Sequence, residues 1–319
     1  MPVSQLRPVG KLRSRFLAAL EPADRARIVD LSGHMSHAVH AWAERYPLIR
    51  GVRVAPLSLS VAAGGFPFTT LEALISTARL SLWVFTVDDL FDEGHAAEHE
   101  LIERAECYRA LIHREVACPP NDGLATALCD VRDDLARYPL FDRLGTEWAT
   151  ALCGTVDGML AEYQWSLPRA SLPSYAEYVR NGRYSIGGPP HMWAAVITAD
   201  DASAPAHVEH LRAMEQLAST SIRLANDLQS FEKEVAEGQI NALVILSRAL
   251  EEQGMSAPAA FRQAAARVQA DMLSGLRSLT GLRAGVVTDT GHPEAAMDNI
   301  ARFVCDFYTH HDYHTFPGV

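Results

Sequence analysis

Residues 70–94 read TLEALISTARLSLWVFTVDDLFDEG, an apolar segment that ends in a cluster of acids. The first 18 of these residues contain only one acid and one base. A helix with so little polar surface belongs at the centre of a large helical bundle. Asp88, Asp89 and Asp92 then stand at the end of a buried helix, where like charges repel one another unless a cation lies between them.

Helical periodicity continues along most of the 319-residue chain. Apolar residues recur at intervals of three and four over residues 12–46, 124–141, 148–165 and 207–238. The only strand candidate is 52–61, and Pro56 weakens it. No fixed-period repeat and no change of composition divides the chain. We therefore expect one all-α domain of about ten helices over residues 1–319.

Composition excludes several classes of protein. Hydrophobic residues make up 48% and charged residues 21% of the chain, which is ordinary for a soluble globular protein. The net charge of −11 and the lack of a basic stripe argue against a nucleic-acid partner. No segment has the apolar length of a membrane span or a signal peptide, and the five scattered cysteines read as reduced thiols. We expect a cytoplasmic protein.

The acid cluster is suited to a hard metal ion. On a helix, Asp88 and Asp92 are four residues apart and Asp89 and Asp92 are three apart, so all three are expected to project toward one side. Mg²⁺ prefers one or two carboxylates and keeps its other positions for water or phosphate. The alternative is a solvated helix end with an acidic cluster of no function.

A second polar stripe lies about 140 residues downstream. Asn226, Ser230 and Glu234 follow one another at intervals of four, and four residues advance about 400° around a helix, so the three share one face. An amide, a hydroxyl and a carboxylate on one face can form a second Mg²⁺ site. The alternative is a polar surface with local hydrogen bonds.

Together the two motifs resemble those of bacterial class I terpene synthases. That family carries DDxxD and, downstream, (N/D)DxxSxxxE, facing each other across an apolar cavity. Here they read DDLFDE from Asp88 and NDLQSFEKE from Asn226. The resemblance covers the whole chain and implies a single α-bundle with a central apolar cavity, about three Mg²⁺ ions and an isoprenyl diphosphate substrate. It leaves a homodimer open.

The resemblance also implies cations for the diphosphate. Arg180 lies 46 residues before Asn226, at the family's usual spacing for a diphosphate-sensing arginine. Arginine can hold phosphate oxygens with a two-pronged fork. Arg183 and Tyr184 stand where the family has its linker and effector, in place of the commoner acid and glycine, and helix breaks at Gly182 and at Gly187-Gly188 leave the effector open. Lys233 matches a lysine that contacts diphosphate.

The C-terminal tail, residues 309–319, departs from the family pattern. Relatives often end in an Arg-Tyr pair that closes over the diphosphate. Here Tyr313 fits, but Asp312 stands in place of the arginine. One of His310, His311 and His314 could substitute for the arginine, the lid could close differently, or the tail could have no catalytic part.

Aromatic side chains are expected to line the cavity. Phe85 lies one helical turn before Asp89, and Trp193 is the second candidate. Ring faces stabilise cations, which matters if the intermediates are carbocations. Core packing is the alternative for each.

The function implied is ionisation of a linear diphosphate followed by cyclisation, with geranylgeranyl diphosphate favoured. Three alternatives stay open: a sesquiterpene synthase acting on farnesyl diphosphate, an isoprenyl diphosphate synthase, and a helical scaffold that binds cations without catalysis. A chain-elongating enzyme usually shows a second aspartate-rich motif, and NDLQSFEKE is not one.

Overall fold

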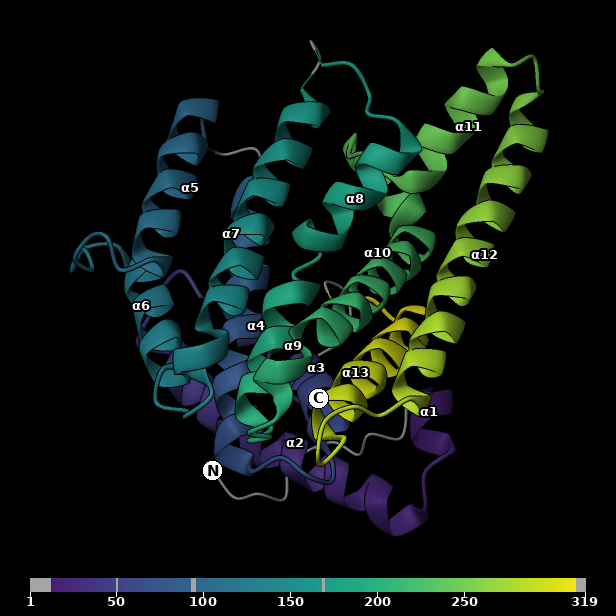
Figure 1. Ribbon diagram of the computed structural model, residues 1–319. Coiled ribbons are helices and arrows are strands. Elements are labelled where there is room, and N and C mark those ends of the chain that lie inside the picture. Colours follow the sequence, from purple (N-terminus) through teal and green to yellow (C-terminus); the bar gives the residue numbers. More distant parts are fainter. Residues whose placement is uncertain (1–12, 50, 93–95, 168–169, 314–319) are drawn as a thin grey trace.

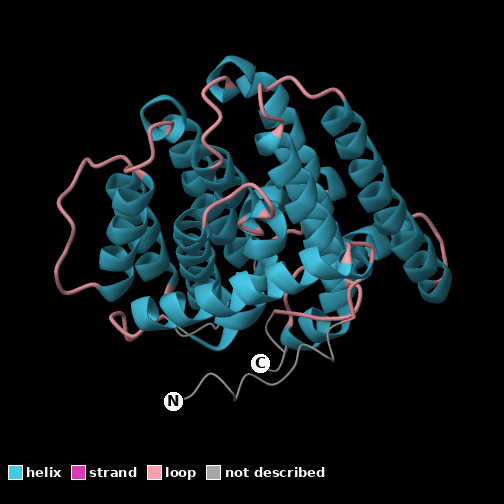
Figure 2. Ribbon diagram, turned by 90° about the horizontal axis from the view of Figure 1, so that it is seen from below, coloured by secondary structure: helices cyan, strands magenta, loops and turns pink. Residues whose placement is uncertain are grey.

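The computed structural model describes residues 13–49, 51–92, 96–167 and 170–313. These residues form thirteen α-helices and no strand (Figures 1 and 2). In chain order the helices are α1 Arg15–Ala18, α2 Pro22–Ala43, α3 Val54–Gly65, α4 Leu71–Asp92, α5 Glu98–Ile112, α6 Gly123–Leu135, α7 Phe141–Ser166, α8 Tyr175–Ser185, α9 Gly188–Thr198, α10 Val208–Glu237, α11 Ala242–Glu252, α12 Ala257–Ala284 and α13 His292–Tyr308. The all-α prediction is confirmed, with more helices than expected because several are short.

Helix α4 lies in the interior of the bundle, as its composition predicts. It packs against α2, α3, α6, α7 and α9, and Figure 1 shows it behind α7 and α9, with α5 and α6 to one side and α11 and α12 to the other. Its buried residues occur all around the helix, from Ala73 to Phe91. Burial of this surface removes a large apolar area from water and anchors the acid-bearing end of α4.

Residues 52–61 form no strand. A short 3₁₀ turn at Gly51–Arg53 leads directly into α3. Pro56 is the third residue of α3, in the first turn, where backbone N–H groups have no partner within the helix and a proline is tolerated. The strand candidate is therefore corrected to a buried helix.

The break between α8 and α9 brings backbone close to the centre of the bundle. Gly187 has φ of 72° and a Cβ on it would lie 2.5 Å from the side chain of Val84. Only glycine adopts this left-handed conformation without strain and leaves that space. The break lets α8 and α9 run in different directions, and it turns Ser185 and Ile186 inward.

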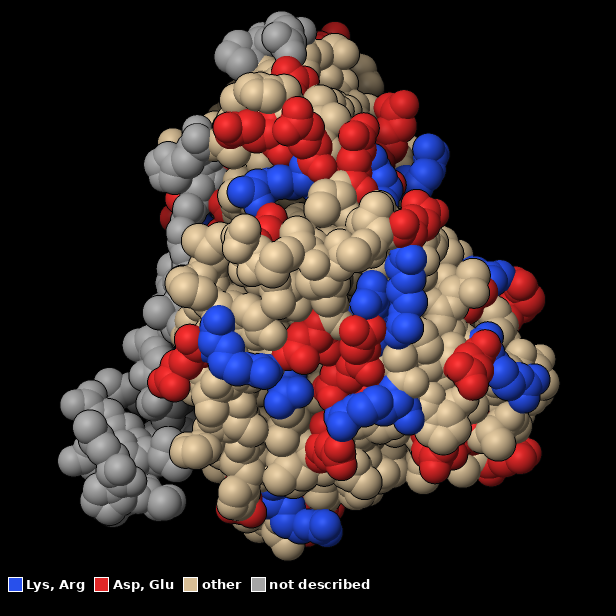
Figure 3. All heavy atoms as spheres, turned by 90° about the vertical axis from the view of Figure 1, so that its left-hand side faces the viewer, with Lys and Arg blue, Asp and Glu red and all other residues tan. Residues whose placement is uncertain are grey.

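The surface carries acids and bases in mixed clusters. On the face shown in Figure 3, lysine and arginine side chains alternate with aspartate and glutamate and form no continuous basic stripe. That face gives no support to nucleic-acid binding. Within the described ranges, no helix combines the length and apolar character needed to cross a bilayer.

Candidate active site

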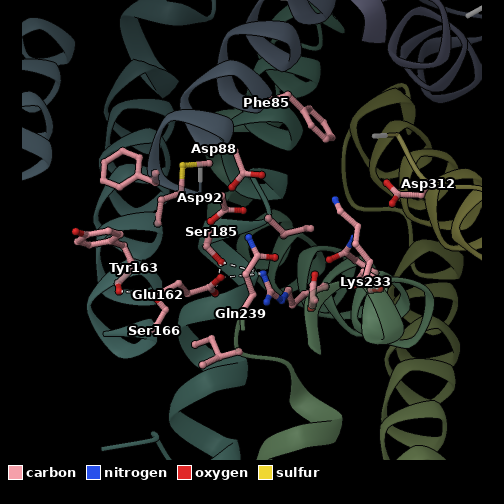
Figure 4. Close-up of a pocket in the computed structure, with 18 of the residues that line it drawn as sticks. Phe85, Asp88, Asp92, Glu162, Tyr163, Ser166, Ser185, Lys233, Gln239 and Asp312 are labelled. Atoms are coloured by element: carbon pink, nitrogen blue, oxygen red, sulfur yellow. Dashed lines mark hydrogen bonds and ion pairs between the residues drawn. The ribbon is translucent and has the colours of Figure 1, made fainter. Parts of the chain in front are cut away.

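A deep pocket opens between α4, α7, α8, α10 and the end of α13 (Figure 4). Five of the six residues predicted as metal ligands line it, together with Lys233. Helices α4 and α10 are far apart in sequence, so the fold places the two motifs at one cavity. The polar and charged lining residues are Asp88, Asp92, Glu162, Tyr163, Ser166, Ser185, Arg223, Asn226, Ser230, Lys233, Glu234, Gln239, Tyr308 and Asp312.

Asp88 and Asp92 project from the last two turns of α4 into this pocket. In the described part of the chain, no side chain forms a hydrogen bond or an ion pair with either carboxylate. Burial, followed by repulsion from Asp92 and Asp89, raises the pKa of Asp88 well above its ordinary value. Asp92 is exposed at the end of α4, yet partial desolvation of its carboxyl, together with Glu162 and Glu234, raises its pKa to about 7. Among the described residues no cation pairs directly with either carboxylate, and the charge of Arg223 offsets the upward pKa shifts only in part.

Asp89 turns away from the pocket. Its two carboxylate oxygens accept hydrogen bonds from Nη1 and Nη2 of Arg53, each at 2.7 Å, and both side chains are buried. Neighbouring helical residues point about 100° apart, so Asp88 and Asp89 cannot face the same cavity. The structure gives Asp89 an ion pair that ties α4 to the start of α3, and metal binding by Asp89 stays a prediction.

Asn226, Ser230 and Glu234 form a continuous stripe along α10 beside the pocket. Ser230 Oγ donates to the backbone carbonyl of Asn226 at 2.8 Å. Glu234 Oε2 accepts a hydrogen bond from Asn241 Nδ2 at 2.8 Å, and Asn241 is fully buried at the N-terminus of α11. Asn241 therefore positions Glu234. Local sequence patterns did not indicate this role, because the hydrogen bond joins α10 to the start of α11 across the intervening turn.

Arg223 is a pocket cation that the sequence reasoning missed. It precedes Asn226 by three residues and so lies one helical turn earlier on nearly the same face. Its guanidinium contacts Glu162 at 3.2 Å and Asp227 at 3.1 Å, and it also donates to the Tyr178 hydroxyl. Arg223 is 6% exposed. Arg223 could have been found from its spacing to Asn226 on α10. Its partners Glu162 on α7 and Tyr178 on α8 could not have been found in this way.

Negative charge dominates this pocket. Among its described lining residues, five are acids and two are cations, and Arg223 is already paired with Glu162. Lys233 has no carboxylate partner in the described residues. No three His, Cys, Asp or Glu side chains of the described part stand close enough to form a metal centre alone. The donor set fits Mg²⁺, which takes few protein ligands and completes its shell from water or phosphate.

An apolar cavity continues inward from the polar pocket. The two share Val84, Phe85, Ile186 and Tyr308. Phe85 thus lines both spaces, and its contact with a substrate stays a prediction. Further lining residues of the apolar cavity are Leu57, Ser60, Val61, Leu80, Ser81, Gly187, Gly188, His191, Met192, Ile222, Ile300, Val304 and Tyr313.

The tail residues are divided between the two spaces. Asp312 is buried and lines the polar pocket. Tyr313 lines the apolar cavity instead, and its hydroxyl is hydrogen-bonded to Ser60 while its ring lies 5.3 Å from that of Phe85. A contact between Tyr313 and diphosphate stays a prediction. His310 and His311 do not line the pocket, and His314 lies outside the described residues.

The remaining candidates lie away from both cavities. Arg180 is exposed on α8. Arg183 stacks over the ring of Tyr184 at 4.4 Å and donates to its hydroxyl at 2.5 Å. Trp193, on α9, is 2% exposed and belongs to the main hydrophobic core. None of the four is among the residues that line the polar pocket or the apolar cavity, and their roles toward a substrate stay predictions.

Comparison with solved structures defines the fold. The chain superposes on 2-methylisoborneol synthase from Streptomyces coelicolor A3(2), solved with Mg²⁺ and 2-fluoroneryl diphosphate, with a TM-score of 0.73, 16% identity and 98% coverage of both chains. A protein from ancestral sequence reconstruction, SVS_A2, gives a TM-score of 0.74 with 16% identity over 94% of this chain and 88% of that one. These likenesses confirm the predicted class I terpene synthase fold.

Sequence comparison identifies the family. The family described as terpene synthase family 2, C-terminal metal binding, matches residues 79–273. The chain belongs to this terpene synthase family. It is 25% identical over 288 residues to (12E)-labda-8(17),12,14-triene synthase of Streptomyces cyslabdanicus, covering 86% of this chain and 83% of that one. Ent-pimara-8(14),15-diene synthase of Oryza sativa subsp. japonica is 27% identical over 236 residues, or 68% of this chain, which spans only 27% of that relative's length.

Proposed function

We propose that this protein is a Mg²⁺-dependent class I terpene cyclase that ionises a linear isoprenyl diphosphate and cyclises the resulting carbocation. One observation carries the proposal: the acids of α4 and the amide, hydroxyl and acid of α10 line one polar pocket, and that pocket continues into an apolar cavity. The first space suits a charged head group, and the second suits a hydrocarbon.

Metal ions would be held at two edges of the pocket. Asp88 and Asp92 would bind two Mg²⁺ ions, and Asn226, Ser230 and Glu234 would bind a third. Bound Mg²⁺ would neutralise the diphosphate and make it a better leaving group. The uncompensated carboxylates support this assignment, since an acidic pocket repels diphosphate unless cations are added.

Two side chains would contact the leaving group directly. Lys233 has no carboxylate partner within the described chain and lines the pocket, so its ammonium can meet phosphate oxygens. Arg223 sits deeper, held in place by Glu162 and Asp227, and presents fixed positive charge. Preorganised charge of this kind stabilises the negative charge that develops as the carbon–oxygen bond breaks.

The apolar cavity would fold the hydrocarbon and keep water out. Phe85 and Tyr308 stand where the two spaces meet, so their rings would lie beside the carbon that becomes cationic. Exclusion of water lets the carbocation react with its own double bonds before it is quenched.

We further propose geranylgeranyl diphosphate as the substrate. The relatives named for labdatriene and pimaradiene products make diterpene skeletons, which favours a twenty-carbon chain. Farnesyl diphosphate is the second candidate, because the fold is not limited to twenty-carbon chains. The solved 2-methylisoborneol synthase holds 2-fluoroneryl diphosphate, whose chain is shorter than both.

The test is incubation of the purified protein with Mg²⁺ and the C10, C15 or C20 diphosphate, followed by measurement of released diphosphate and gas chromatography of the products. We expect diphosphate and a cyclic hydrocarbon or alcohol, most of it from the C20 substrate. Asp88→Ala and Asn226→Ala should lose both. A longer linear diphosphate formed on addition of isopentenyl diphosphate would instead identify a chain-elongating enzyme, and no release from any substrate would refute catalysis of this kind.

A further inference from the structure

The wall of the apolar cavity carries one basic side chain. Its polar residues, among those described, are Ser60, Ser81, His191, Tyr308 and Tyr313. Four of these are hydroxyls, which are protonated and very weakly basic at neutral pH. Only His191 has a ring nitrogen that can accept a proton there.

Hydrogen bonding links the proton of His191 to the hydroxyl of Ser81. Nδ1 is 2.6 Å from Ser81 Oγ, and Ser81 Oγ is 3.0 Å from the Thr77 carbonyl, which can only accept. When Ser81 gives its one hydrogen to this carbonyl, it accepts from Nδ1–H. In that arrangement the proton of the neutral ring sits on Nδ1 and Nε2 carries the lone pair.

The other nitrogen, Nε2, is buried and has no hydrogen-bond partner in the described part of the chain. Burial lowers the pKa of His191 to about 4, so the ring is neutral at physiological pH. An unpaired buried nitrogen is unfavourable for folding, and such exceptions occur where a group has a chemical role. A neutral ring also avoids placing a permanent positive charge beside a carbocation.

His191 lies beyond the metal pocket. Its partner Ser81 shares one stripe of α4 with Phe85 and Asp88, and it precedes Asp88 by seven residues, or roughly 10 Å along the helix. The metal-binding end of α4 and the histidine therefore stand at opposite ends of the connected spaces. His191 lines the apolar cavity, and Asp88 and Asp92 line the polar pocket.

Resting on the proposed function, we infer that His191 accepts the proton that ends the carbocation cascade. A C–H bond on the carbon next to the cationic centre breaks, and its electron pair forms the new carbon–carbon double bond. The proton moves to Nε2 and leaves an imidazolium, which returns the proton to the released diphosphate or to water when the product departs. A carbon next to a cationic centre is a far stronger acid than imidazolium, so even a weakly basic histidine suffices.

The first experiment compares His191→Phe with the unmodified enzyme, using the C20 diphosphate and Mg²⁺. Phenylalanine keeps a planar ring and removes the lone pair. We expect diphosphate release within about threefold of the unmodified rate, while the share of its principal olefin falls at least about tenfold in favour of other isomers or alcohols. His99→Phe, on the exposed face of α5, should keep the original products.

The outcomes separate the two proposals. An unchanged product profile in folded His191→Phe would overturn the role of His191 and leave the cyclase assignment intact. Loss of diphosphate release in folded His191→Phe would also overturn it, because the residue would then act before cyclisation. Absence of release from the unmodified protein with every substrate would remove the proposed function and this inference together.

A second measurement is independent of turnover. In protein labelled with ¹⁵N-histidine, NMR should show His191 as the neutral form protonated on Nδ1. Ser81→Ala should mix the two neutral forms and shift the product profile in the same direction as His191→Phe, by a smaller factor. A proton found on Nε2 of the unmodified protein would overturn the inference, because no lone pair would then be available.

Discussion

Arg53 holds both carboxylate oxygens of Asp89 at 2.7 Å, whereas the adjacent Asp88 has no ion pair or hydrogen bond with a side chain of the described residues. Two adjacent acids of one motif therefore have opposite surroundings. Asp88 lines the open pocket, where added cations can reach it, whereas Asp89 is neutralised by Arg53 within the protein. This difference separates the effects of replacing them.

We expect Asp89→Asn to lower the free energy of unfolding by about 3–5 kcal/mol, because it removes the anionic partner of a buried guanidinium. Diphosphate release by the folded fraction should stay within about threefold of the unmodified rate. Urea unfolding and a diphosphate assay measure the two quantities. A folded, stable Asp89→Asn protein without turnover would place Asp89 back among the metal ligands.

Asp88→Asn should behave in the reverse way. Removing one of several crowded carboxylates relieves repulsion, so stability without Mg²⁺ should be unchanged or higher. Diphosphate release should fall by about 10²-fold or more, because the pocket loses a ligand for the cations that stabilise the leaving group. Equal turnover in Asp88→Asn and the unmodified enzyme would contradict the assignment.

Arg223 and Arg180 are competing candidates for the arginine that contacts the diphosphate. Arg223→Lys keeps the charge but loses the fork that contacts Glu162 and Asp227, so diphosphate release should fall by about 10²-fold. Arg180→Ala, at an exposed position, should stay near the unmodified rate. Circular dichroism provides the control for folding. If only Arg180→Ala lost activity, the assignment based on spacing would be correct after all.

Glu215, on α10, should make stability depend on pH. It is 3% exposed, and burial raises its pKa from 4.5 to about 7, opposed by Arg183. Below pH 4.5 the carboxyl is protonated in both the folded and unfolded states. Between pH 4.5 and about 7 only the unfolded state loses the proton, so the free energy of unfolding falls as pH rises, by about 3 kcal/mol in total.

Glu215→Gln removes this titration. The variant should match the unmodified protein near pH 4.5 and exceed its stability by up to about 3 kcal/mol at pH 7 and above. Glu106→Gln, at an exposed site on α5, should show no such divergence. Urea titrations across this range test the prediction, and two parallel stability curves for Glu215→Gln and the unmodified protein would refute it.

Metal and ligand should rigidify the polar pocket. Without cations, the repulsion between Asp88 and Asp92 opposes order at the end of α4, whereas Mg²⁺ with inorganic diphosphate would connect α4 to α10. Amide exchange in residues 84–92 and 222–234 should slow by about tenfold or more when both are added. Peptides from α12 serve as the internal reference. Identical exchange with EDTA would show that this end of α4 is ordered without ligands.

The sequence indicated the fold and most of the pocket because both depend on periodicity. An apolar helix with no polar face must be buried, and residues four apart share a face, so the Asn226 stripe was visible in the order of residues. The same geometry separates Asp89 from Asp88, because adjacent helical residues diverge by about 100°. Its partner Arg53 lies 36 residues away and required the folded structure.

Long-range partners account for the other differences. Arg223 was on a visible stripe, but its function as a pocket cation depends on Glu162 of α7 and Tyr178 of α8. Asn241 reaches Glu234 across a turn. Arg180 had the right residue type and spacing, yet the way α8 packs turns it outward. Distances along a chain do not report which way a short helix is rotated.

Val84, Phe85, Ile186 and Tyr308, the residues common to both cavities, include neither a proposed metal ligand nor a pocket cation. Under the proposed function, the positions that bind the head group and those that shape the hydrocarbon are thus nearly separate sets. Mutations at the deep wall can change ring closure without altering the ionisation machinery. The residues of the apolar cavity can therefore change while those of the polar pocket are kept, so one scaffold can give rise to many carbon skeletons.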